Sequence, residues 1–426
     1  MRRNFVDCQG LAGAWSLGTA QAGFDLLHRV ALPGGFGNAV MEENRSKFRG
    51  LNTWWHQEDG TPADGWTPQM NVSFLCGTPP CSGFSLMNAS KGENARGPGS
   101  LINNCMRELI TYAGMCTGSD GRPGPEIVSF ESVQGAYTQG RSLMVELLTI
   151  LNELTYARYA TDSRFDVPRY EITHVLMSGG SVGAAQMRHR YFPVFHRIPF
   201  GVDQPPERHV TTYEMAIGDL QGAKLQWEDQ RYKRKDRFQF QTDRRRDDGL
   251  FDSHVTKDEG RVADVIHQFW DGWNIGENLT QSLERRGIRP PELEKSWNEA
   301  EQKYNGWSWP VKIRPDRCGY VLTGGAIHGV VHWAEPRLLT VRECSRLMGY
   351  PDAWTWPTGN SGQASMWIGK CCPVNSGQWL SEWALRALEG DPGEPGAKIG
   401  EDENLFNCTL AYKKWPGGSV PKRLED

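Results

Sequence analysis

A cysteine that follows two prolines is the residue best suited to covalent chemistry in this sequence. The stretch 75–85 runs from an apolar segment through Pro79 and Pro80 to Cys81. The two prolines predict a rigid turn, which would present Cys81 at the end of a strand. A cysteine thiolate at such an edge can act as a nucleophile. An isolated cysteine is more often a buried core residue, so neighbouring groups must decide between the two interpretations.

Two further segments carry groups that could act on the same substrate. Glu131 follows an apolar run at 126–130, so its carboxylate would lie at a strand end, where it could protonate or hydrogen-bond a ring nitrogen. Arg188 and Arg190 alternate in an extended segment, which turns both side chains to one side. Taken alone, such an acid is more often a helix cap, and such arginines are more often solvated. If a nucleophilic cysteine lies at the same edge of the sheet, a catalytic role becomes the better interpretation of Glu131.

The elements that would position these residues alternate along the chain. A strand at 4–7, a glycine turn at 10–14, a helix at 15–24 and a strand at 38–41 closed by Glu42 form the nucleotide-binding half of a doubly wound sheet. Further strands are expected at 72–75, 126–130 and 174–177, and helices at 101–113, 143–159, 340–348 and 374–388. The predicted fold class is therefore α/β, with a mostly parallel sheet between two helical layers.

The composition of the sequence changes after residue 194. From 195 to 316 the chain is polar, charged and Trp-rich, with basic runs at 231–235 and 244–246. We therefore predict a separate, smaller domain over 195–316. The first domain, 1–194, is expected to resume at 317–390, and a loosely ordered tail to follow at 391–426.

Composition restricts the class of protein. The apolar fraction of 38% and the aromatic fraction of 11% are sufficient for a substantial core. The chain contains neither a membrane-length apolar run nor a signal-peptide pattern at its start. Its ten cysteines include no pair of CxxC motifs, so we expect a reduced, cytoplasmic protein without a metal site. The net charge of −4 does not exclude DNA as a partner, since binding depends on where the positive charge lies.

Taken in order, eight segments resemble the motif series of DNA cytosine-C5 methyltransferases. They are the loop 7–24, Glu42, Pro79-Pro80-Cys81, Gly99-Ser100-Leu101, Glu131-Ser132-Val133, the triplet Gln186, Arg188 and Arg190, the stretch 336–352 and the stretch 368–374. The resemblance covers most of 5–192 and 311–388. It implies the S-adenosylmethionine-dependent methyltransferase fold, with 195–316 as the target-recognition domain.

The resemblance also implies roles for individual residues. Cys81 would attack a cytosine flipped out of double-stranded DNA, Glu131 would hydrogen-bond its N3, and Arg188 and Arg190 would polarise the base and position the thiolate. The remaining substrate contacts would come from Ser85, Gln186, Arg231, Lys233 and Arg244. The cofactor would be held by Asp7, Gln9, Gly10, Leu11, Gly13, Glu42, Pro79 and Lys370. A monomer acting in a bacterial or phage-infected cell is expected.

Several departures from the family pattern lie at the cofactor. Gln9 replaces the aromatic residue that lies against the adenine, and Leu11 replaces a loop glycine. Ser132 replaces the asparagine after the catalytic acid, and Lys370 replaces the asparagine of the last motif. A buried ammonium at 370 would need an anionic partner, which could be the carboxylate of carboxy-S-adenosylmethionine. Three functions therefore stay open: methyl transfer from S-adenosylmethionine, carboxymethyl transfer, and DNA binding without catalysis.

Overall fold

A computed structural model describes most of the chain. The described residues are 3–31, 37–49, 67–85, 97–159, 169–203, 211–221, 266, 268–289, 297–298, 303–304, 310–319, 321–322, 330–357, 361–393, 397–398 and 406–408. They fall into two compact units. The first comprises Met1–His209 with Cys371–Asp426, and the second comprises Val210–Lys370.

The first unit is built on one mixed sheet with the strand order β11-β12-β5-β6-β4-β3-β1-β2. Strands β2, β1, β3 and β4 run parallel, and β6 lies antiparallel between β4 and β5. The strands span Asn4–Cys8 (β1), Asp25–Val30 (β2), Phe74–Gly77 (β3), Ile127–Phe130 (β4), Glu171–Ser178 (β5), His189–His196 (β6), Ala397–Lys398 (β11) and Phe406–Cys408 (β12). The predicted α/β class with a mostly parallel sheet is confirmed.

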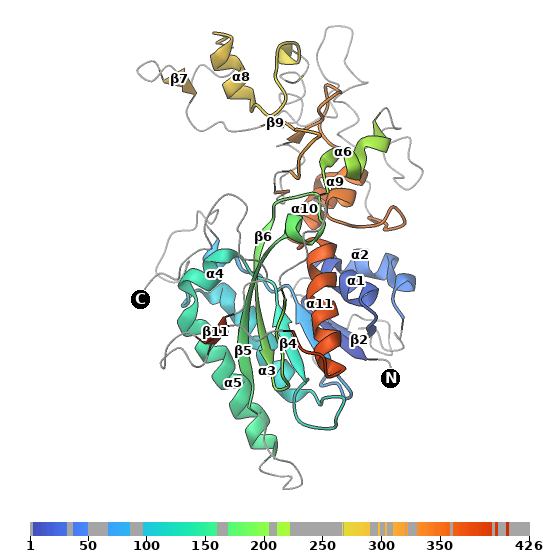
Figure 1. The fold of residues 1–426 in the computed structure, drawn as a ribbon, viewed down its shortest axis with the longest axis vertical. Coiled ribbons are helices and arrows are strands. Elements are labelled where there is room, and N and C mark those ends of the chain that lie inside the picture. Colours follow the sequence, from blue (N-terminus) through green and yellow to red (C-terminus); the bar gives the residue numbers. More distant parts are fainter. Residues whose placement is uncertain are drawn as a thin grey trace. The chain divides into compact units, whose positions relative to one another are not determined.

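Helices cover both faces of this sheet because its central strands are apolar on both sides. On β3, Phe74 packs against Trp15 of α1 with ring centroids 6.4 Å apart, whereas Leu75 joins a core cluster with Leu109 of α3. Figure 1 shows α11 beside α1, and α5 on the opposite side of the strands. The helices of this unit span Ala14–Gln21 (α1), Asn38–Glu43 (α2), Asn104–Met115 (α3), Gln134–Gln139 (α4), Arg141–Tyr159 (α5) and Val374–Leu388 (α11), with short 3-10 turns at Arg45–Lys47 (η1), Ser82–Phe84 (η2), Leu101–Asn103 (η3) and Gly179–Val182 (η4).

The prediction of the second strand was wrong. Residues 38–41 belong to helix α2, which begins after Gly37 in a left-handed conformation (φ 79°). The strand that pairs with β1 is β2, where Asp7 lies in register with Arg29. The two side chains form a buried ion pair, with Arg29 Nη1 2.8 Å from Asp7 Oδ2. Because this pairing neutralises both charges, an arginine is accommodated inside an otherwise apolar sheet.

The second unit is a small assembly of short elements. They are α6 (Tyr213–Ile217), η5 (Gly218–Leu220), α8 (Leu279–Arg285), the antiparallel pair β7 (Trp297–Asn298) and β8 (Lys303–Tyr304), the parallel pair β9 (Val311–Lys312) and β10 (Val330–Val331), α9 (Val341–Leu347) and α10 (Ser361–Lys370). Helix α9 begins with a capping box between Thr340 and Glu343. It packs against both α6 and α10.

The packing of α9 places the boundary between the units differently from the sequence prediction. Residues 317–370 were expected to rejoin the first domain, but they group with the second unit. The physical reason is that β10 pairs with β9 and α9 packs on α6, so this stretch is held by its neighbours in the second unit. The structure likewise extends the first unit to His209, beyond the predicted end at 194.

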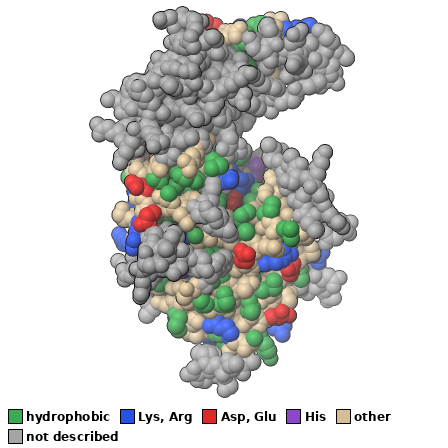
Figure 2. All heavy atoms as spheres, turned by 180° about the vertical axis from the view of Figure 1, so that it is seen from behind, with side chains coloured by type: hydrophobic (Ala, Val, Ile, Leu, Met, Phe, Trp, Pro, Cys, Tyr) green, Lys and Arg blue, Asp and Glu red, His purple; other side chains and the backbone are tan. Residues whose placement is uncertain are grey.

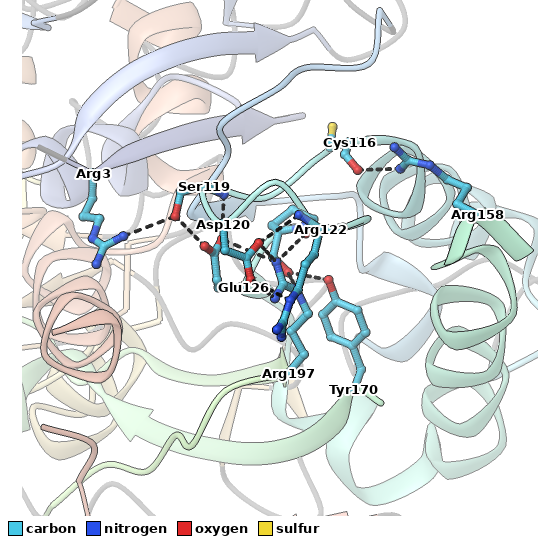
Figure 3. A network of polar contacts seen from close by, with 11 residues as sticks. Arg3, Cys116, Ser119, Asp120, Arg122, Glu126, Arg158, Tyr170 and Arg197 are labelled. Atoms are coloured by element: carbon cyan, nitrogen blue, oxygen red, sulfur yellow. Dashed lines mark hydrogen bonds and ion pairs between the residues drawn. The ribbon is translucent and has the colours of Figure 1, made fainter. Parts of the chain in front are cut away.

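A polar network closes the end of the sheet where β4 and β5 begin and β6 ends (Figure 3). Arg197 donates to both carboxylate oxygens of Asp120 at 2.7 Å and to the backbone carbonyl of Gly124 at 3.0 Å. Ser119 links Glu126 to Arg3 near the start of the chain. These charges are satisfied by one another, so the network is structural and lies at the edge opposite to Cys81.

Elsewhere on the surface, charge is mixed. Figure 2 shows acidic and basic side chains scattered among apolar and uncharged ones over the described part of one face. Among the described helices, none is both long and apolar enough to cross a membrane.

Loss of Arg29 should destabilise the first unit strongly. Arg29→Met leaves the Asp7 carboxylate buried without its counter-charge, which is expected to lower the free energy of unfolding by about 3–5 kcal/mol. Urea unfolding followed by circular dichroism measures this. The matched control is Arg45→Met, because Arg45 and Glu42 form an exposed ion pair at 3.9 Å and should contribute under about 1 kcal/mol. Equal effects of the two substitutions would contradict this role for the buried pair.

Candidate active site

Cys81 and Glu131 each follow the end of a strand, and the two strands are neighbours in the sheet. Strands β3 and β4 pair in parallel with Gly77 opposite Phe130. The backbone N–H of Glu131 then donates to the carbonyl of Gly77 at 2.8 Å. Both chains therefore leave the sheet side by side at its carboxyl edge, where ligands bind in doubly wound folds.

Strand β6 brings Arg190 to the same place. Two backbone hydrogen bonds join Ser132 to Tyr191, with N···O distances of 2.8 and 3.0 Å. This bridge aligns the residues on either side, and Arg190 Nε forms an ion pair with Glu131 Oε1. The Glu131 side chain is 4% exposed and that of Arg190 is 15% exposed, so the pair is largely shielded from water. A shielded pair interacts more strongly than one in open solvent.

Cys81 sits next to this pair as a thiol. It precedes η2 and is partly exposed. Burial, and secondarily the Glu131 carboxylate, raises the pKa of Cys81 to about 11, although Arg190, the Val133 amide and Arg188 each lower it. The Cys81 thiol of the free protein is therefore protonated at neutral pH, and a reaction that needs its thiolate would have to favour loss of this proton.

Arg188 completes the cationic side of the site. It is 3% exposed, and burial together with repulsion from Arg190 lowers its pKa to about 10, while Glu131 opposes that shift. Arg188 thus stays charged at neutral pH. Gln186 is fully buried nearby in the chain, just before β6. The structure thereby brings together the four residues predicted to be catalytic: Cys81, Glu131, Arg188 and Arg190.

Two residues near the site were missed by sequence reasoning. Burial raises the pKa of the Cys372 thiol well above its ordinary value, and Glu131 adds to this shift, so Cys372 lies close to the acid. Its position within the last motif, 368–374, was the available signal. Val133 was the other: its backbone amide stabilises a Cys81 thiolate.

The loop between β1 and α1 is shaped by close approaches. A Cβ atom at Gly10 would lie 1.8 Å from Asp7 Oδ1, so only glycine fits there. Gly13 has φ 81° and precedes α1 as its N-cap. Leu11 has φ 47°, a left-handed conformation that disfavours a branched side chain. Arg29 stabilises it by donating from Nη2 to the Leu11 carbonyl at 2.7 Å.

Other predicted site residues lie in different settings. Glu42 is exposed on α2, beside Arg45, and not at the end of a strand. Lys370 ends α10 and is exposed, so the premise of a buried ammonium there was wrong. Pro79 is buried, and Ser85 is partly exposed after η2. Arg231, Lys233 and Arg244 lie outside the described residues.

Comparison with known proteins gives consistent matches. Residues 52–382 match the family model described as C-5 cytosine-specific DNA methylase. The chain is 24% identical over 323 residues to the Type II methyltransferase M.BbvI of Brevibacillus brevis, covering 72% of this chain and 68% of that protein. Among solved structures, it is similar to the Entamoeba histolytica methyltransferase EhMeth, with 11% identity, a TM-score of 0.48, and coverage of 92% and 100% of the two chains. It is also similar to S. pombe Dnmt2 methyltransferase, with 13% identity, a TM-score of 0.45, and coverage of 91% and 99%.

The ionisation of Cys81 should respond to Glu131. Glu131→Gln removes the charge that raises the thiol pKa and releases Arg190, so both effects lower it. A fall of about one unit would speed alkylation of Cys81 by iodoacetamide at pH 8 about tenfold. Peptide mass spectrometry across a pH series measures this rate at Cys81 alone.

Glu126→Gln is the matched control for this alkylation experiment. Glu126 is a buried acid in the network at the other edge of the sheet, and its loss should leave the Cys81 profile unchanged. If Glu131→Gln leaves the inflection of the profile where it is, or raises it, the electrostatic coupling of Glu131 to Cys81 is wrong.

Proposed function

Because this chain belongs to the C-5 cytosine-specific DNA methylases, we propose that Cys81 forms a covalent bond to C6 of a cytosine flipped out of double-stranded DNA. DNA cytosine methylation is the activity of the family. The observation that carries the proposal is the meeting of Cys81, Glu131, Arg188 and Arg190 at one edge of the sheet. A base inside a duplex cannot reach such an edge, so it must leave the stack, at a cost of about a few kcal/mol.

The chemistry begins at the poorly nucleophilic C5 of cytosine. Addition of the Cys81 thiolate to C6 makes an enamine, which shifts electron density onto C5. Glu131, carrying a proton in this step, would donate it in a hydrogen bond to N3 and so offset the negative charge that develops there. C5 would then attack the methyl carbon of a sulfonium cofactor, and the broken S–CH3 bond would leave its electron pair on sulfur as a neutral thioether. Loss of the C5 proton restores the C5–C6 double bond and breaks the bond from C6 to Cys81, which regenerates the enzyme.

The two arginines have separable tasks in this proposal. Arg190 holds Glu131 by an ion pair and lies near enough to Cys81 to favour its thiolate. Arg188 is more deeply buried and would polarise the cytosine carbonyl. Arrival of the base would replace water around both groups, and a drier site strengthens their effect on the thiolate.

The cofactor that we propose is S-adenosylmethionine, whose sulfonium supplies an electrophilic methyl group. The loop with Asp7, Gln9, Gly10, Leu11 and Gly13 would hold it at the carboxyl edge of β1, together with Pro79 after β3. The position of the loop supports this fit, because it follows β1 at the carboxyl edge of the sheet, where ligands bind in doubly wound folds. Gly13, with φ 81°, allows the chain to turn there into α1.

Carboxymethyl transfer is the alternative to methyl transfer that Lys370 suggests. An ammonium could pair with a carboxylate on the transferred carbon and favour carboxy-S-adenosylmethionine. The exposed position of Lys370 weakens the case, because an ammonium in water needs no buried counter-charge. We therefore propose methyl as the transferred group.

Recognition of the DNA target is assigned to the second unit. Its basic runs at 231–235 and 244–246 suit phosphate contacts. These residues lie outside the described part of the chain, so the proposal rests on their charge and on the separate packing of Val210–Lys370.

Trapping with a modified base tests the nucleophile. DNA containing 5-fluorocytosine has no C5 proton to lose, so wild-type protein with S-adenosylmethionine should form a covalent complex visible by denaturing electrophoresis. Cys81→Ala should form none. The matched control is Cys105→Ala, since Cys105 is a partly exposed thiol on α3 and its loss should leave trapping intact. An adduct that survives Cys81→Ala would disprove the assignment.

Neutralising the basic runs tests the role of the second unit. Replacing Arg231, Lys233, Arg234 and Lys235 by glutamine should weaken DNA binding. The slope of log K against log salt should also fall, by about 0.9 for each phosphate that the variant no longer neutralises. Fluorescence anisotropy over a salt series measures both. Arg386→Gln, which removes a half-exposed cation on α11, should change neither; unaltered affinity and slope in the quadruple variant would rule out these phosphate interactions.

A further inference from the structure

The backbone that follows Cys81 is packed tightly against two neighbouring segments. The backbone N–H of Phe84 donates to the Cys81 carbonyl at 3.1 Å and closes the turn η2. The first neighbour is α4, where a Cβ atom at Gly135 would lie 2.3 Å from the Phe84 carbonyl oxygen. The second is the start of η3, since a Cβ atom at Gly83 would lie 2.9 Å from the Cβ atom of Ser100. A backbone in such close contact cannot shift unless its neighbours also move.

The side chain of Asn103 ties the second neighbour to this turn. The Gly83 carbonyl accepts a hydrogen bond from the backbone N–H of Gly97 at 2.9 Å. Asn103, the last residue of η3, donates from Nδ2 to the carbonyls of Gly97 at 3.0 Å and Pro98 at 2.9 Å. Its Oδ1 lies close enough to Gly83 that a Cβ atom there would be 3.2 Å away. Asn103 is therefore connected to a residue only two positions after the nucleophile.

The stability of the fold does not by itself require an amide at Asn103. Its side chain is fully buried, and Oδ1 has no hydrogen-bond partner among the described residues. An unmet buried acceptor disfavours the folded state, and an apolar side chain of similar size would avoid that cost. Gly97 and Pro98 are partly exposed, so water could donate to their carbonyls instead. What the two Nδ2 hydrogen bonds specify is the position of residues 97–98, and of Gly83 against them.

We propose that Asn103 is a positioning residue for the addition of Cys81 to cytosine, an inference that rests on the proposed function. It would act through Gly97 and Gly83 and not on the base itself. The bond from sulfur to C6 forms readily only from a geometry in which the two atoms are about 3–3.5 Å apart and aligned. A displacement of about 1 Å can slow such a step about a hundredfold. Residues that fix the Cys81 turn would therefore control the rate of addition without altering the ionisation of the thiol.

Removal of the amide tests this role. Asn103→Leu gives a side chain of similar size without hydrogen-bond donors. With saturating S-adenosylmethionine and 5-fluorocytosine DNA, the full-length variant should form the covalent complex at least about tenfold more slowly than wild type in a single turnover. Its affinity for the DNA, measured by fluorescence anisotropy, should be unchanged. The rate of Cys81 alkylation by iodoacetamide across a pH series should also match that of wild type, whereas a loosened fold would expose the thiol and raise it.

Two further variants separate positioning from a general loss of structure. Asn104→Leu makes the same substitution one residue later, where the side chain is exposed and Oδ1 accepts from Arg107 at 3.1 Å. It should form the covalent complex at the wild-type rate. Gly83→Ala disturbs the contact from the other partner, because the added Cβ atom would collide with Ser100. It should slow covalent trapping, as Asn103→Leu does, at unchanged DNA affinity.

The outcomes are distinguishable. Covalent trapping by Asn103→Leu at the wild-type rate would refute the role of Asn103, and so would a slower rate that is fully explained by weaker DNA binding or altered alkylation. If Asn103→Leu lacks a cooperative urea transition, Gly83→Ala decides: slower trapping supports the positioning contact, and an unchanged rate refutes it. If wild type itself forms no covalent complex, the proposed function fails and this inference fails with it.

Discussion

The ion pair between Glu131 and Arg190 is the constraint on which the proposed chemistry depends. An acid held against a thiol in a largely dry site would be costly without a counter-charge, and Arg190 supplies it. The pair exists because β6 runs antiparallel beside β4, so that the start of one strand meets the end of the other. A fully parallel sheet would place the first residues of β6 at the opposite edge. The mixed strand order is therefore a condition of the site and not an incidental feature.

The charge balance around Cys81 follows from the same pair. Glu131 raises the pKa of the thiol, and Arg190 and Arg188 lower it. The free protein thus keeps the Cys81 thiol protonated. We infer that a base whose N3 shares a proton with Glu131 would reduce the negative charge of the acid, weaken its attraction to Arg190 and leave that cation free to stabilise the thiolate. Activation would then be tied to the presence of cytosine.

Much of the fold could be predicted from the sequence where apolar runs are long. Strands β1, β4 and β5 and helices α5 and α11 fall where those runs indicated, and Cys81 and Glu131 lie at the expected edge. The strand β2 could not be recognised, because Arg29 interrupts its apolar pattern and only the partner Asp7, 22 residues earlier, makes that arginine acceptable. The proximity of Cys372 to Glu131 likewise depends on long-range packing. The unit boundary at 370 depends on contacts of α9 that no local pattern records.

The identity of the modified nucleoside tests the account most directly. Double-stranded DNA would be incubated with the wild-type protein and equal amounts of S-adenosylmethionine and carboxy-S-adenosylmethionine, then digested and analysed by mass spectrometry. The account predicts 5-methylcytosine as the product. N4-methylcytosine or a methylated adenine would contradict transfer to C5, and 5-carboxymethylcytosine would contradict methyl as the transferred group.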